Sequence, residues 1–171
     1  MTETIRYAWG TSSLGSFLAA VSDRGLVMFE FGERTETLDA LRAHVPDARL
    51  KEDGKGLSDL IGSLAELVEH PDRTPDIPLD IRGTDYQKRV WDILRQIPAG
   101  ETTYYGAVAA QLGTRDARDA TAAIASNCIA ILIPCHRVVK KDGSLSGYRA
   151  GPRLKRALLT REQRASNFKL V

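Results

Sequence analysis

The 171-residue sequence contains only two cysteines and three histidines, and it lacks a long uninterrupted apolar segment. Two cysteines are too few for a disulfide framework, and the scattered histidines lack the spacing of zinc ligands, so we predict neither a metal site nor a cofactor. The longest uncharged stretch, residues 121–136, is shorter than a membrane span. The N-terminus shows no basic start followed by an apolar run. We therefore expect an intracellular protein, cytoplasmic in a prokaryote or nuclear in a eukaryote, without membrane association.

The formal net charge of +2 conceals a strong asymmetry along the chain. Residues 135–171 carry ten lysines and arginines against two acids, which gives this segment a net charge of +8. Residues 1–134 carry 14 basic and 20 acidic residues, a net charge of −6. A basic surface of this kind is typical of proteins that bind a polyanion, and nucleic acid is the first candidate. The alternative is a basic tail that only aids solubility.

The N-terminal part of the chain has the pattern of a small sheet with helices. Apolar and β-branched runs at residues 5–9, 16–22 and 26–32 are separated by glycine-containing turns, which predicts a three-stranded antiparallel meander. Helical spacing of apolar residues predicts helices near residues 34–44 and 57–68. Three prolines between residues 69 and 78 then break the chain. We predict a domain boundary there, with domains at residues 1–78 and 79–171.

The C-terminal part is predicted to be mostly helical, so the whole chain is expected to be an α+β protein with an α/β N-terminal domain. Helices are expected near residues 84–97, 105–111, 116–126 and 152–163. The middle two flank a turn at Gly113, which is a weak helix-turn-helix signature. The second of them is rich in alanine, which suits either close approach to a DNA groove or tight core packing. Taken alone, this composition favours packing.

Cys135 followed directly by His136 is the sharpest chemical feature of the sequence. The thiolate is the nucleophilic form, and at a pKa of about 8.5 a free cysteine is only a few per cent ionised at neutral pH. The adjacent imidazole can take the proton, directly or through one water, because Pro134 fixes the local backbone. The imidazole in turn needs an acid that orients it. The acids downstream are Asp142 and Glu162, of which Glu162 in the last helix is the better candidate.

Two neighbouring motifs carry a resemblance to a known family. Residues 133–139, Ile-Pro-Cys-His-Arg-Val-Val, and residues 142–148, Asp-Gly-Ser-Leu-Ser-Gly-Tyr, resemble the active-site signature of the O6-alkylguanine-DNA alkyltransferases, also called methylated-DNA:protein-cysteine methyltransferases. The resemblance extends through residues 86–91, 97–102, Arg118 and residues 158–162, so it is strong from residue 84 to residue 163. It implies a ribonuclease H-like N-terminal domain and a C-terminal domain with a winged helix-turn-helix.

The function that the resemblance implies is direct-reversal DNA repair. The alkyl group of O6-alkylguanine, and of O4-alkylthymine, would pass irreversibly to Cys135, so each molecule would act once. The implied partner is double-stranded DNA, bound as a monomer in the minor groove without reading sequence. The damaged base would be flipped out of the duplex, at a cost of a few kcal/mol.

The resemblance also implies roles for individual residues. In the family, the residues that match His136 and Glu162 relay the thiol proton through a water. The residue that matches Asn127 orders the turn that carries the cysteine. The implied catalytic residues are Cys135, His136, Glu162, Asn127 and Tyr148, the last as a hydrogen-bond donor to guanine. Arg118 would fill the vacated base stack and Tyr105 would turn a phosphate. The remaining implied substrate or DNA contacts are Arg137, Gly147, Arg149, Ala120 and Thr121.

Alternatives of other classes remain open from the sequence. A regulator that recognises alkylguanine without repairing it is one, although relatives of that kind lack the cysteine. A Cys-His hydrolase is another, and it would need an oxyanion hole. A third alternative is that the chain is the C-terminal part of a larger adaptive-response regulator. Asp119 beside Arg118 predicts weaker DNA binding, and Cys128 is interpreted as a buried small apolar residue.

Overall fold

The computed structural model describes residues 2–113, 117–145 and 148–169, and the chain folds as two compact units. Unit 1 comprises Met1–Glu69, Thr74–Ile81 and Cys128–Ala130, and unit 2 comprises His70–Arg73, Arg82–Asn127 and Ile131–Val171. Three residues from the C-terminal half, Cys128–Ala130, therefore pack within unit 1. The division into domains at residue 78 stays a prediction.

Unit 1 is built on a four-stranded sheet in the order β3-β2-β1-β4. Strands β1 (Thr4–Ser12), β2 (Gly15–Val21) and β3 (Leu26–Phe31) form the antiparallel meander that the sequence predicts. Strand β4 (Arg49–Glu52) pairs parallel with β1 and extends the predicted sheet by one strand. Its sequence, Arg-Leu-Lys-Glu, has three charged residues and no apolar run, so no strand pattern marks it.

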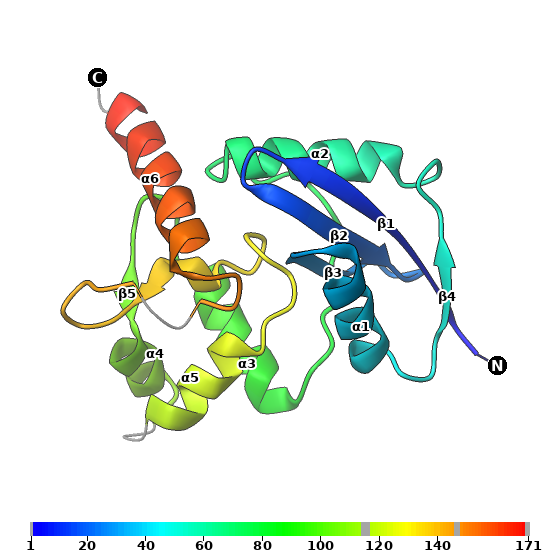
Figure 1. Cartoon of the computed structure of the whole chain (residues 1–171). Coiled ribbons are helices and arrows are strands. Elements are labelled where there is room, and N and C mark those ends of the chain that lie inside the picture. The colour runs from blue at the N-terminus through cyan, green and yellow to red at the C-terminus, as the bar shows by residue number, and fades with distance from the viewer. Residues whose placement is uncertain (1, 114–116, 146–147, 170–171) are drawn as a thin grey trace. The chain divides into compact units, whose positions relative to one another are not determined.

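Helices cover both faces of this sheet (Figure 1). Trp9 and Gly10 are neighbours in β1, so they face opposite sides of the sheet. The Trp9 Nε1 donates to Thr37 Oγ1 of α1 (Arg34–His44) at 3.1 Å. A Cβ at Gly10 would come within 2.6 Å of Ile61 of α2 (Ser58–Glu69). Because both faces are covered, four consecutive residues of β2, Phe17–Ala20, are buried.

The outer edge of β3 is paired with two segments from elsewhere in the chain. Leu26 donates its N–H to Pro78 O at 2.8 Å, and residue 80 donates back to Leu26 O. Phe29 donates to Cys128 O, and Ala130 donates to Phe29 O, both at 2.9 Å. These bonds satisfy an edge that would otherwise be open. Cys128 is buried there, as interpreted from the sequence.

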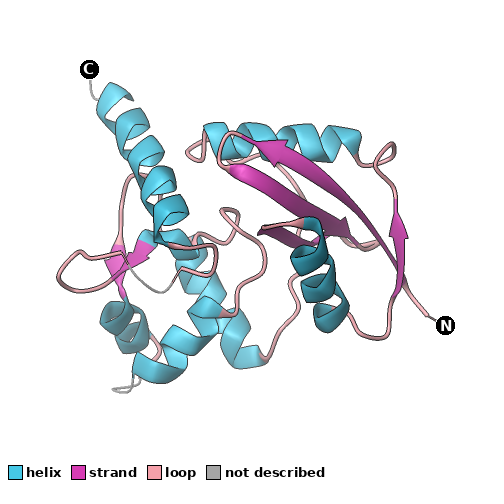
Figure 2. Cartoon of the chain, viewed as in Figure 1, coloured by secondary structure: helices cyan, strands magenta, loops and turns pink. Residues whose placement is uncertain are grey.

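Unit 2 is mostly helical (Figure 2). Its helices are α3 (Asp85–Arg95), α4 (Tyr105–Gln111), α5 (Ala117–Ala125) and α6 (Pro152–Lys169), with a 3-10 turn, η1, at Cys135–Arg137. Two short parallel strands, β5 (Thr103–Tyr104) and β6 (Val138–Val139), pair with each other. The predicted α+β class is confirmed. All helices in the described parts of the chain are too short or too polar to cross a membrane.

The sequence explains where α3 begins and which side it buries. Thr84 and Gln87 form a capping box, in which each side chain accepts the backbone N–H of the other residue. Three residues at helical spacing, Val90, Trp91 and Leu94, face the interior of the unit. This buried side packs on α4 and α5. Hydrogen bonds from Gln87 and Trp91 place the start of α3 beside the end of α5.

Candidate active site

The predicted nucleophile lies in unit 2, on a loop that leaves α5 and ends in η1. The side-chain amide of Asn127 spans this loop: its Nδ2 donates to Ile133 O at 2.9 Å and to Cys135 Sγ at 3.2 Å. Ile131, inside the loop, has a φ of +66°, which is rare for a β-branched residue. The loop is therefore held by specific bonds in a backbone shape that it would not adopt alone. Asn127 lies where the implied role of ordering the turn requires it.

Cys135 is a buried thiol with several nearby polarising groups. Its side chain is 8% exposed, and burial raises its pKa above the ordinary value. The hydrogen bond from Asn127 and the positive charges of Lys155 and Arg149 lower the pKa, but by less than burial raises it. At neutral pH the resting form is the thiol, so transfer chemistry at this sulfur needs a base.

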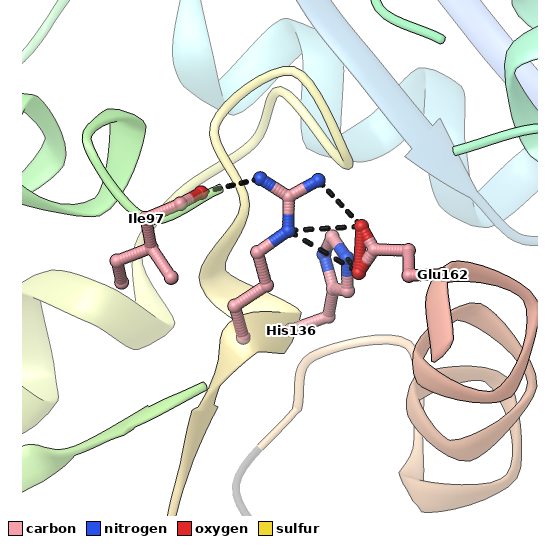
Figure 3. Close-up of polar contacts among 4 residues, drawn as sticks. Ile97, His136 and Glu162 are labelled. Atoms are coloured by element: carbon pink, nitrogen blue, oxygen red, sulfur yellow. Dashed lines mark hydrogen bonds and ion pairs between the residues drawn. The ribbon is translucent and has the colours of Figure 1, made fainter. Parts of the chain in front are cut away.

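His136 is oriented by Glu162, and both side chains are fully buried (Figure 3). The His136 Nε2 lies 2.8 Å from Glu162 Oε1. Burial lowers the pKa of His136 despite the opposing effect of Glu162, so the ring is neutral at pH 7. For Glu162, burial favours the neutral form, but hydrogen bonds from His136 and Arg137 outweigh it and lower the pKa. A neutral imidazole has one N–H, and in His136 this proton lies on Nε2, which donates to the carboxylate. Nδ1 is therefore the unprotonated, basic nitrogen.

The basic nitrogen of His136 is available for proton transfer. Among the described residues, Nδ1 is buried and has no hydrogen-bond partner. One bridging water to the neighbouring thiol would satisfy it, since a buried water needs only a few polar partners. Cys135 precedes His136 directly in the chain, and Glu162 binds the other nitrogen of the His136 ring, which is the connectivity that a proton relay requires.

Arg137 lies buried against Glu162, whereas the sequence predicts that it contacts DNA. The residue is 7% exposed, and its guanidinium binds the Glu162 carboxylate through Nε and Nη2, with Nε at 2.9 Å from Oε2. Its Nη1 donates to Ile97 O at 2.6 Å (Figure 3). Burial of a carboxylate without partners is unfavourable in free energy. The two Arg137 nitrogens donate to Oε2, the carboxylate oxygen that His136 does not bind. The structure gives Arg137 the role of holding Glu162, and its contact with DNA stays a prediction.

Arg137→Gln is expected to lower the free energy of unfolding by about 3–5 kcal/mol, because it breaks a buried ion pair and leaves Glu162 under-bonded. The matched control is Arg156→Gln, which changes the charge equally on the exposed side of α6. Urea unfolding measures the loss of stability. DNA binding is then measured as a function of salt concentration, at a temperature where both variants are folded, to detect a phosphate contact. Unchanged stability together with a reduced salt dependence for Arg137→Gln would show that Arg137 contacts DNA and does not stabilise the fold.

Lys155 is a member of the site that sequence reasoning missed. Although it is a lysine, it is fully buried, and burial lowers its pKa while the nearby Cys135 raises it. Its Nζ lies 5.8 Å from the ring centroid of Tyr105. Burial, followed by the proximity of Cys135, raises the pKa of Tyr105. Both residues therefore lie near the sulfur, and the Lys155 cation favours its thiolate form.

Residues 145–149 carry three of the predicted substrate contacts. The Tyr148 ring lies beside His136, with 6.5 Å between ring centroids. Arg149 is exposed and close enough to influence the Cys135 charge. Gly147 lies outside the described residues. Tyr148 is thus near the proton relay, where a donor to a leaving base would have to be.

Helix α5 shows which alanines pack and which face outward. Ala120 is 0% exposed and lies on the buried side with Ala123 and Ile124, and its contact with DNA stays a prediction. Thr121 is half-buried, and its hydroxyl donates to Ala117 O at 2.7 Å. Arg118 is exposed in the first turn. The small residues serve packing on one side of α5 and leave the outer side to Arg118, Asp119, Ala122 and Ala125.

The described residues contain no group of three or more His, Cys, Asp or Glu side chains that could hold a metal ion.

Residues 85–164 match the family model for the 6-O-methylguanine DNA methyltransferase, DNA binding domain. The inducible methylated-DNA–protein-cysteine methyltransferase of Bacillus subtilis is 34% identical over 157 residues, which cover 89% of this chain and 87% of the relative. The chain belongs to the methylated-DNA–protein-cysteine methyltransferase family. The resemblance in the motifs is confirmed.

Other family members show how the chain relates to longer proteins and solved structures. The bifunctional transcriptional activator/DNA repair enzyme Ada of Escherichia coli is 40% identical over 160 residues, 92% of this chain and 45% of the relative. The chain thus spans about half the length of the first curated relatives that it matches. A crystal structure of the Mycobacterium tuberculosis O6-methylguanine methyltransferase matches with a TM-score of 0.78 and 36% identity, covering 94% of this chain and 93% of that chain. A crystal structure of the mycobacterial protein in complex with DNA matches over the same shares, with a TM-score of 0.75 and 36% identity.

Proposed function

We propose that this protein removes the alkyl group from O6-alkylguanine in double-stranded DNA and keeps it as a thioether on Cys135. The observation that carries the proposal is the buried thiol of Cys135, which is followed directly in the chain by a neutral imidazole that Glu162 orients. Family membership and the names of the curated relatives support the same activity. The proposal includes O4-alkylthymine as a second substrate, and one protein molecule acting alone.

The proposed transfer begins with the proton of Cys135. It passes through one water to His136 Nδ1, and Glu162 stabilises the imidazolium that forms. The sulfur attacks the alkyl carbon, a carbon–sulfur bond forms, and the carbon–O6 bond breaks with its electron pair moving onto guanine. The guanine anion accepts a hydrogen bond from Tyr148 and takes up a proton in place of the one that left the thiol. The products are an ordinary guanine and an uncharged thioether.

The chemistry of the product makes the proposed reaction a single event for each molecule. A thioether has no proton to lose and no good leaving group, so neither His136 nor a water regenerates the thiol. The protein is therefore a stoichiometric acceptor, which distinguishes it from a Cys-His hydrolase that would turn over.

The outer side of α5 is the proposed contact with DNA. Arg118, Ala122 and Ala125 are exposed and follow one another at helical spacing. Small side chains allow a helix to approach the floor of the minor groove closely, and the groove gives little sequence information. Arg118 at the start of this stripe is proposed to fill the space that the flipped base leaves.

Arg118→Ala is expected to slow transfer from duplex DNA by about 10- to 100-fold, because the cost of base flipping is no longer offset. Transfer from free O6-alkylguanine base should be unchanged. The control Arg95→Ala removes the same charge from an exposed position of α3. Single-turnover rates on the two substrates test this prediction. An equal loss on both substrates would show that Arg118 acts through folding instead.

The pH dependence follows from the lowered pKa of His136. An ordinary imidazole is half-protonated at pH 6.5, but the buried ring stays a neutral base to lower pH. The rate of transfer from the free base is therefore expected to hold as the pH falls from about 8 to 6.5 and to drop only in more acidic solution. Single-turnover rates from about pH 5 to pH 8 measure the midpoint. A midpoint at or above 6.5 is incompatible with this site.

A further inference from the structure

We propose that Gln87 and Trp91 of α3 are positioning residues for the transfer reaction. They hold the C-terminal end of α5 and thereby fix Asn127, the residue whose amide binds the Cys135 sulfur. The inference rests on the proposed function only in taking Cys135 as the alkyl acceptor. Their hydrogen bonds go to Thr84, Ser126 and Ala123, so we argue their effect on the sulfur through Asn127.

The end of α5 is capped by side chains from outside the helix. The last carbonyl groups of an α-helix have no partner within it and must find one elsewhere. Trp91 is buried, and its Nε1 donates to Ala123 O at 2.9 Å. The Ser126 hydroxyl donates to the same oxygen at 2.7 Å. These bonds set the direction in which the chain leaves α5, immediately before Asn127.

Gln87 ties the same point to the start of α3. Its Oε1 accepts the N–H of Thr84 at 2.9 Å as half of the capping box. Because Oε1 faces that N–H, Nε2 faces the other way, and it donates to Ser126 Oγ at 3.1 Å. One side chain thus caps α3 and also binds the residue that precedes Asn127.

Gly83 closes the corner in which these two side chains lie. A Cβ at this position would come within 2.7 Å of two ring atoms of Trp91 and within 2.8 Å of Gln87 Oε1. Glycine is needed where a backbone approaches side chains this closely. The indole and the amide therefore have little room to adopt another rotamer, and their bonds to α5 define a single geometry.

The sulfur is sensitive to this geometry because the Asn127 side chain donates a hydrogen bond to it. The Nδ2 to Sγ distance is 3.2 Å, and the bond lowers the pKa of Cys135 against the larger rise caused by burial. Hydrogen bonds weaken steeply as their distance and angle depart from the optimum. A looser end of α5 therefore weakens this bond, raises the pKa of Cys135 and lowers the fraction of thiolate.

Gln87→Glu is the sharpest test, because it separates the two roles of the side chain. Glutamate at this position still accepts the Thr84 N–H and keeps the capping box, but it has no donor for Ser126. The control Lys88→Gln produces the same change in charge at the adjacent, exposed position. The readout is alkylation of Cys135 by iodoacetamide as a function of pH, assigned by peptide mass. It uses no alkylated DNA, so it stands apart from the test of the proposed function.

For Gln87→Glu we expect Cys135 to react about three- to tenfold more slowly at neutral pH, the effect of one hydrogen bond. The midpoint of its pH profile should move upward, while Lys88→Gln should match the unaltered protein. Trp91→Phe, which keeps a ring but loses the Nε1 donor, should shift the midpoint in the same direction. Thermal unfolding of each variant confirms that it is folded. If the midpoint of Gln87→Glu coincides with that of the unaltered protein, or shifts equally in Lys88→Gln, the proposal is overturned.

Discussion

Replacing His136 with glutamine is expected to slow alkyl transfer by about 10²- to 10⁴-fold, the contribution of a positioned general base. Glutamine is uncharged and close in size to a neutral imidazole, and its amide can still donate to Glu162. It has no basic atom in place of Nδ1, which is the buried nitrogen that has no hydrogen-bond partner among the described residues. The thiol then has no acceptor for its proton, and burial keeps it protonated because burial raises the pKa of Cys135.

The control for this variant is His70→Gln, the same change at an exposed histidine of unit 2. Single-turnover transfer from the free O6-alkylguanine base measures the rate without any contribution from DNA binding. Thermal unfolding shows whether the substitution disturbs the fold. If His136→Gln is folded and transfers within tenfold of the unaltered protein, the assignment of His136 as the base is wrong.

Glu162→Gln is expected to have the second large effect, again about 10²- to 10⁴-fold on the rate, by analogy with an acid that orients a catalytic histidine. The carboxylate holds His136 Nε2 at 2.8 Å and fixes Nδ1 as the basic nitrogen. An amide can turn its NH₂ group toward Nε2 instead, which moves the ring proton to Nδ1 and removes the base. The amide also carries no charge to stabilise the imidazolium.

The same substitution is expected to destabilise the fold by about 3–5 kcal/mol, because Arg137 loses the buried partner of its guanidinium. The control Glu101→Gln alters an exposed carboxylate of unit 2. Rates are compared at a temperature where both variants are folded, and NMR of the His136 ring reports which nitrogen carries the proton. Full activity of Glu162→Gln with an unchanged ring tautomer would contradict the proton relay.

Much of this site could be predicted from the sequence, because the motif around Cys135 keeps its chemistry within a few residues. His136 is adjacent to the nucleophile, and Glu162 is the better placed of two downstream acids. Asn127 was implied by the resemblance, and the structure places its amide 3.2 Å from the sulfur. Secondary structure followed equally local signals, such as the capping box at Thr84 that begins α3.

The residues whose surroundings the sequence does not reveal are those that depend on tertiary packing. An arginine in a basic segment suggests a phosphate contact, yet Arg137 is buried against Glu162, 25 residues away in the chain. A lysine in a basic helix is expected on the solvated face, yet Lys155 is buried. It follows Leu154 directly and lies three residues before Leu158, and both leucines are buried. The position of Lys155 between these two leucines is the signal in the sequence that points to its burial. Ala120 shows the same limit, since composition alone does not say which side of a helix is covered.

The most direct test of the account is the intact mass of the protein after incubation with duplex DNA that contains O6-methylguanine. We predict a gain of one methyl group per molecule, located on the peptide that contains Cys135, with no second transfer when more substrate is added. Cys135→Ser should gain nothing, while Cys128→Ser should behave like the unaltered protein. Demethylation of the DNA by Cys135→Ser, or a methyl group on any other residue, would contradict the central claim.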